Sequence, residues 1–135
     1  MSMKRSITLT LDPINEASLV SKRTISRQMG AANYFSGIVR EGEEGKQIEA
    51  IDYEAFDKMA RHQFDLIFDE IEQRWPIESI RLVHRTGKVL VNESSLWVEV
   101  VSAHRSEAFE ACQWLIDEMK KRVPIWKRPI FIDSD

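Results

Sequence analysis

The segment from Val100 to Arg128 constrains the fold most strongly. Its sequence, VVSAHRSEAFEACQWLIDEMKKRVPIWKR, indicates the end of a strand, a turn, a long helix and a short cationic segment after Pro124. Apolar residues recur at the spacing of a helix that packs one face against a core. Proline cannot continue a helix, so the helix is expected to end before Pro124. The residues of the predicted apolar face are Phe109, Cys112, Leu115 (or Ile116) and Met119.

Basic residues lie at both ends of this predicted helix. His104 and Arg105 occupy the turn before it, where free backbone N–H groups and the helix dipole favour an anion such as a phosphate. Lys120 belongs to a run of cations that complements the negative end of the dipole. Lys127 follows in the segment after the proline, next to Trp126, which is a candidate for the wall of a pocket. A helix with cations at both ends suggests a site for an anionic ligand.

Each of these residues also has a simpler interpretation. A lysine becomes a nucleophile or acyl acceptor when burial or neighbouring cations favour its neutral form, which makes Lys120 and Lys127 candidates. Helix-end lysines that only aid solubility explain the same pattern, and the pattern alone favours that explanation. His104 can be a plain helix cap beside an exposed Arg105. Arg40, at the end of a predicted strand, can be an anion clamp or a surface residue.

Composition excludes several classes of protein. The chain has 135 residues, a formal net charge of -3 and one cysteine. Its length predicts a single domain over residues 1–135, and its acidity argues against general nucleic-acid binding. No apolar run reaches the roughly 20 residues that span a bilayer, and the amino terminus does not resemble a signal peptide. One cysteine fits a reducing cytoplasm, and no Cys, His or carboxylate cluster predicts a metal or cofactor.

The remaining pattern predicts an α+β fold, with a mainly antiparallel sheet and helices packed on it. The longest helix is expected from about Tyr53 to Trp75, ended by Pro76. A first, short helix is expected to begin at Asp12-Pro13. Strand 47–53 is expected to pair back on strand 31–40 across an acidic loop, 41–46, and Gly37 indicates a bulge or a close backbone approach. The predicted strands are 6–11, 31–40, 47–53, 79–85, 88–91 and 96–102.

Several motifs together resemble one known family. SAHR at 102–105, EAFEA at 107–111 and DEMKKRVPIWKR at 117–128 resemble the large, catalytic subunit of molybdopterin synthase. Further agreement comes from FSGIVR at 35–40, YEAF at 53–56 and the RWPI and VHRTG segments within 74–87. The combination of SAHR with K-x-x-x-P-x-W-K is the specific part, and the resemblance extends over about residues 30 to 128.

The resemblance implies an α/β hammerhead fold with a small extra antiparallel sheet. It implies a sulfurtransferase of molybdenum cofactor biosynthesis, a homodimer flanked by two copies of a small ubiquitin-like subunit as a heterotetramer. The thiocarboxylated Gly-Gly terminus of that subunit delivers sulfur to cyclic pyranopterin monophosphate and forms the dithiolene of molybdopterin. Matching the motifs places the catalytic lysines at Lys120 and Lys127, and the substrate contacts at Arg40, His104 and Arg105.

Two observations from the residues agree with this chemistry. A protein with one buried cysteine cannot easily load sulfur itself, so a carrier is needed. A cationic pocket suits both a carboxy-terminal tail and a cyclic phosphate. The alternative is a non-catalytic module that binds a phosphorylated metabolite or an acidic partner tail through the same basic residues. An RNA-binding domain is a weaker alternative, because the chain is acidic and lacks paired aromatics on a glycine-rich strand.

Overall fold

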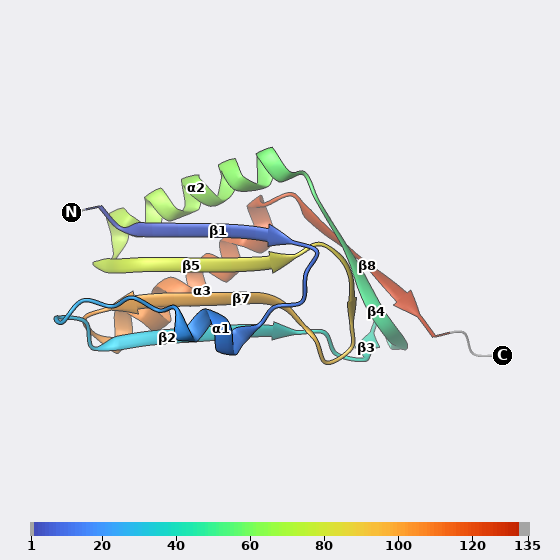
Figure 1. The fold of residues 1–135 in the computed structure, drawn as a ribbon. Helices are drawn as coiled ribbons and strands as arrows, with labels where there is room; N and C mark the ends of the chain where they lie inside the picture. The colour runs from blue at the N-terminus through green and yellow to red at the C-terminus, as the bar shows by residue number, and fades with distance from the viewer. Residues whose placement is uncertain (1, 133–135) are drawn as a thin grey trace.

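Two β-sheets and three helices make up the computed structural model, which describes residues 2–132 (Figure 1). The larger sheet has the strand order β1-β5-β7-β2. The pair β1 and β5 is parallel, while β5 with β7 and β7 with β2 are antiparallel. This sheet therefore agrees with the predicted, mainly antiparallel arrangement. Its strands are β1 (Lys4–Thr10), β5 (Ile77–Arg85), β7 (Ser94–Ser102) and β2 (Ala31–Ile38).

Two long helices, α2 (Asp57–Arg74) and α3 (Arg105–Arg122), cover one face of the larger sheet (Figure 1). Their apolar faces meet alternate residues of β5 and β7 and form the main core. The prediction of a long helix that ends before Pro124 is confirmed for α3. The prediction of its apolar face was wrong about Phe109, whose side chain is 58% exposed, because Ala108 and Ala111 complete the buried face. The buried residues of α3 are Ala108, Ala111, Cys112, Leu115 and Met119.

The smaller sheet lies at one end of the larger one (Figure 1). Its long strand β4 (Lys46–Ala55) pairs with β6 (Gly87–Leu90) and with β8 (Ile125–Phe131), and at its start with β3 (Gly42–Glu43). A tight turn at residues 44–45, both with positive φ, joins β3 to β4. Its own core is built from Val39, Ile48, Ile51 and Val89.

Two predictions fail at this smaller sheet, and one of its strands was missed. Strand β4 does not pair with β2. The residues predicted to begin the long helix at Tyr53 belong to β4, because Tyr53 pairs with Gly87 on one side and Lys127 on the other. Strand β8 was not predicted at all, since proline interrupts its sequence. Among the residues that the structure describes, β8 pairs only with β4, and an edge strand tolerates the missing N–H of Pro129.

The short helix α1 (Glu16–Ser21) also begins later than expected. Asn15, and not Asp12, is the N-cap, because the Asn15 side chain accepts a hydrogen bond from the Ser18 N–H at 3.0 Å. The predicted bulge at Gly37 is present, with a register shift between Gly37 and Ile38 in the pairing of β2 with β7. The α+β fold class is confirmed. Within residues 2–132, no helix is long and apolar enough to cross a bilayer.

Candidate active site

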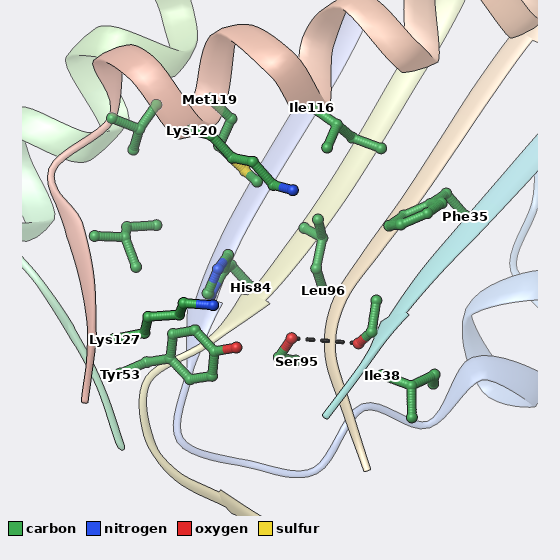
Figure 2. Close-up of a pocket in the computed structure, with 13 residues that line it drawn as sticks. Phe35, Ile38, Tyr53, His84, Ser95, Leu96, Ile116, Met119, Lys120 and Lys127 are labelled. Atoms are coloured by element: carbon green, nitrogen blue, oxygen red, sulfur yellow. Dashed lines mark hydrogen bonds between the residues drawn. The ribbon is translucent and has the colours of Figure 1, made fainter. Parts of the chain in front are cut away.

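A cavity of about 470 Å³ lies where the smaller sheet meets the end of the larger one, and we call it the lysine cavity. That volume is typical of a site for a small molecule or a peptide end. Lys120 reaches it from α3 and Lys127 from β8 (Figure 2). The walls also include His84, Tyr53 and Ser95. The apolar residues of the lining are Phe35, Ile38, Leu96, Ile116, Met119, Val123 and Ile125.

Of the cations that end α3, Lys120 is the one that lines the lysine cavity. Lys121 pairs with Glu118 at 3.4 Å on the surface. Arg122 pairs with Glu70 at 2.6 Å, which ties α3 to α2. Lys120 has no hydrogen-bond or ion-pair partner within residues 2–132. Its ammonium is therefore free to meet a ligand, whereas its two neighbours are held by carboxylates.

The alternation of β8 separates the cations after the proline. Lys127 lies directly opposite Tyr53 in β4, and cross-strand partners share a face, so both side chains meet at the cavity. Arg128 belongs to the other face and pairs with Asp52 at 2.9 Å. Lys127 is not wholly free, because its Nζ lies 3.7 Å from Oε1 of Glu43, the last residue of β3. Arg128 is therefore directed away from the cavity that Lys127 lines.

Sequence reasoning missed His84 and Tyr53 as residues of the site. The His84 ring is 5% exposed, and the Tyr53 ring meets it edge-on at 5.2 Å between centroids. Burial lowers the pKa of His84 below its ordinary value, against the opposing effect of its hydrogen bond to the Arg85 carbonyl. The alternation in β5 was the available signal, because it directs His84 to the same face as the core residues Ile80 and Leu82.

His104 and Arg105 lie at the opposite end of α3 from Lys120. They line a second, more open cavity of about 500 Å³ with Gly30, Ala103 and Ser106. His104 is the N-cap residue of α3, but its side chain makes no capping hydrogen bond. At 1.5 Å per residue, the helix separates Arg105 from Lys120 by about 22 Å. A single protomer therefore does not bring the predicted phosphate contacts to the two lysines.

Arg40, Trp126 and Cys112 lie outside the lysine cavity. Arg40 is exposed, two residues beyond Ile38 at the cavity wall, with no ion pair among the residues that the structure describes. Trp126 is 50% exposed and packs edge-on against Phe56 at 4.7 Å, so the prediction that it walls the pocket is wrong. Burial raises the pKa of the Cys112 thiol to about 11, which keeps it protonated and unreactive at neutral pH.

Within the described residues, no group of three or more His, Cys, Asp or Glu side chains is placed to hold a metal ion. The chemistry available in the lysine cavity is therefore that of two ammonium groups, a neutral imidazole, a phenol and a hydroxyl. Such a site can hold an anionic group between apolar walls and move protons near it. The fold and this site together define the class of the protein: an α+β protein with a cationic pocket at the junction of two sheets.

Comparisons with known proteins identify the family. The family described as MoaE protein matches residues 9–122. The chain is 41% identical over 115 residues to the human molybdopterin synthase catalytic subunit, covering 85% of this chain and 61% of the human protein. It is 43% identical over 105 residues to the Pyrococcus abyssi protein of the same name, covering 78% of this chain and 71% of that one.

The same family appears among solved structures. The molybdopterin synthase structure from Staphylococcus aureus superposes with a TM-score of 0.84 and 34% identity, covering 94% of this chain and 92% of that one. The chain belongs to the MoaE family. It spans about three fifths of the length of the human relative, so the activity of the whole relative is a matter for proposal.

Proposed function

We propose that residues 1–135 form a catalytic-subunit domain that transfers sulfur from a thiocarboxylate to cyclic pyranopterin monophosphate, making the dithiolene of molybdopterin. The sulfur donor is the Gly-Gly carboxy-terminus of a small ubiquitin-like carrier. The observation that carries the proposal is the convergence of Lys120 and Lys127, from two separate elements, in one cavity of about 470 Å³. The names of the relatives agree with this activity.

The properties of the cavity fit the end of a carrier tail. A thiocarboxylate is an anion on an extended chain, and two ammonium groups can bind it while Phe35, Leu96 and Ile116 contact the chain. The carrier is needed because Cys112, buried and protonated, is a poor acceptor for sulfur. We assign Lys120, which pairs with no carboxylate among residues 2–132, to the acyl carbon of the tail. Lys127 is assigned to substrate binding or proton transfer.

The second cavity supports a homodimer. His104 and Arg105 lie about 22 Å along α3 from Lys120, too far to share a pterin-sized substrate with it inside one protomer. If both groups contact the same substrate, they come from two copies of the chain. We therefore propose a homodimer, with one carrier for each lysine cavity. Arg40, exposed beyond β2, is a further candidate to act across that dimer. A cytoplasmic location remains our expectation from the single cysteine.

Reconstitution tests the proposed function. The protein is mixed with thiocarboxylated carrier and cyclic pyranopterin monophosphate, and dithiolene product is measured. We expect Lys120→Ala to lose at least 100-fold in turnover while the carrier still binds, since it removes a group that acts on the reacting atoms. Lys121→Ala is the matched control, because Lys121 is the next residue and pairs with Glu118 on the surface. It should retain wild-type turnover.

Other results decide between the candidate functions. If the wild-type protein makes no product although carrier and substrate are competent, the protein is instead the non-catalytic binding module. Product undiminished by Lys120→Ala keeps the enzyme and refutes the role of Lys120. For the dimer, a mixture of inactive Arg105→Ala and Lys120→Ala proteins should regain activity through mixed dimers. No recovery after the subunits have exchanged would refute a site shared between two copies.

A further inference from the structure

The lysine cavity contains one basic nitrogen that the proposed roles of the lysines do not use. Along β5, Ile80 and Leu82 direct their side chains into the main core, and His84 takes the next position on that face. The apolar stripe thus ends in an imidazole where the core opens into the cavity (Figure 2). A leucine at this position would bury as much surface as the histidine does, so burial alone does not explain the imidazole. This suggests that the imidazole has a chemical role.

Hydrogen bonding fixes which nitrogen of the ring is basic. Nδ1 of His84 lies 2.7 Å from the carbonyl oxygen of Arg85. A carbonyl oxygen only accepts hydrogen bonds, so Nδ1 carries the hydrogen and the lone pair of the neutral ring is on Nε2. Within residues 2–132, Nε2 has no hydrogen-bond partner and is not among the wholly enclosed polar atoms. The lone pair is therefore available to a ligand or a water in the cavity.

The groups around His84 make it the proton acceptor of the cavity. The titratable side chains that share the lining are Tyr53 from β4, Lys120 from α3 and Lys127 from β8. Ammonium groups are donors without an acceptor. The hydroxyl of Ser95 donates to the Gly37 carbonyl at 3.2 Å. From the larger sheet, β2 and β7 add no charged side chain to the lining.

We infer that His84, through Nε2, is the general base that activates the water which releases the carrier from the transferred sulfur. The inference rests on the proposed function and goes beyond it. When the thiocarboxylate sulfur bonds to a substrate carbon, that sulfur joins the substrate to the acyl carbon of the carrier as a thioester. The product is free only after the bond between the acyl carbon and sulfur breaks.

The step balances with water as the co-reactant. Water forms a bond to the acyl carbon and gives one proton to Nε2 of His84. The bond from the acyl carbon to sulfur breaks, and its electron pair leaves on sulfur as a substrate thiolate, stabilised by the lysine ammonium groups. The carrier departs as a carboxylic acid that ionises, and the imidazolium returns its proton to the solvent. A cavity of about 470 Å³ leaves room for water beside a tail.

The matched variant is His84→Asn. The asparagine amide nitrogen can replace Nδ1 as donor to the Arg85 carbonyl, but nothing replaces the lone pair of Nε2. In a single turnover with saturating carrier, we expect product formation to slow by about 100-fold or more. The covalent adduct of carrier and substrate should accumulate and be visible by intact-mass spectrometry. The Kd of the carrier should stay within about twofold of wild type.

The pH profile separates a base from a structural residue. Burial lowers the pKa of His84, so the wild-type rate should rise with pH below about 6.5 and be flat above it. His84→Asn should lack this rise. A variant rate within twofold of wild type, with the same rise, would overturn the inference. So would a slow variant that keeps the rise, shows no adduct and has lost carrier affinity, because that pattern indicates a packing role.

Two further measurements complete the test. If His84→Asn does not fold, His84→Gln takes its place, with the same expected loss, since an amide is not a base. Nitrogen NMR of the wild-type protein at pH 7 should show His84 with hydrogen on Nδ1, and a hydrogen on Nε2 would overturn the inference without any variant. Absence of product with the wild-type protein would refute the proposed function. A normal rate in the His84 variant would refute only the role of His84, so the two failures can be told apart.

Discussion

The ion pair between Arg81 and Glu99 should be the most sensitive polar contact of the fold. Glu99, on β7, is 1% exposed, and Arg81 contacts both of its carboxylate oxygens at 2.7 Å. A third hydrogen bond, at 2.8 Å, joins Arg81 to the Leu19 carbonyl of α1. The guanidinium also lies 5.1 Å from the ring of Trp97, and the hydrogen bonds to Glu99 raise the pKa of Arg81. The arginine thus joins β5, β7 and α1 on the sheet face opposite the long helices.

Arg81→Met leaves the Glu99 carboxylate buried without its counter-ion. Breaking a buried pair in this way costs about 3–5 kcal/mol of unfolding free energy. With about 2.1 cal/mol/K of unfolding entropy per residue over 135 residues, the Tm should fall by roughly 11–18 °C. Urea and thermal denaturation followed by circular dichroism measure both quantities. The double variant Arg81→Met with Glu99→Met, which removes both charges, should recover most of the loss.

Arg5→Met provides the comparison, because the carboxylates that pair with Arg5 are far more exposed than Glu99. Its pairs with Asp69 and Glu72, at 2.8 Å each, involve partners whose side chains are 58% and 34% exposed. Exposed pairs of this kind contribute about 1 kcal/mol or less. A loss below 1 kcal/mol for Arg81→Met, or a double variant whose loss equals the sum of the single losses, would refute the reasoning about the buried pair.

Two other predictions concern the candidate sites. Glu43→Gln removes the carboxylate that lies 3.7 Å from the Lys127 ammonium. The anionic carrier tail should then bind about two- to fivefold more tightly, as measured by calorimetry, because exposed ion pairs contribute little free energy. Weaker binding would show that Glu43 does not compete with the tail for Lys127. Gly30→Ala should cost about 1–3 kcal/mol in urea denaturation, because its Cβ would lie 2.7 Å from the backbone oxygen of Ala103. Gly42→Ala, whose Cβ meets nothing within 4 Å, is the control and should change stability little; equal losses would contradict the steric argument.

Local patterns in the sequence predicted what depends on local structure. The period of α3 and the proline after it set the length of that helix and placed Lys120 near its end. The bulge at Gly37 followed from a glycine within a strand pattern. Position and neighbouring charge made Lys120 and Lys127 candidates, and the motifs of the resemblance selected them as the catalytic pair. The structure brings these two lysines together in one cavity, while their roles stay a prediction.

Pairing between distant segments was beyond the reach of the sequence. Strand β8 exists because residues 125–131 pair with β4, 70 or more positions earlier in the chain, and no local signal in a proline-containing segment indicates that partner. The same pairing keeps Tyr53 in a strand where local periodicity predicted a helix. Contacts of this kind are decided by the register of the whole sheet and override local preference.

The sequence by itself determined that this chain is an α+β protein with cations at both ends of one helix, because periodicity, proline and charge are properties of neighbouring residues. Only the tertiary structure decided which cations share a cavity. Lys121 and Arg128 lie beside the two candidate lysines in the sequence, yet both side chains are directed away from the cavity and pair with surface carboxylates. His84, distant in the sequence, joins the cavity instead. The physical reason is that contacts between residues far apart in the chain set the strand register and the face of the sheet or helix on which each side chain lies.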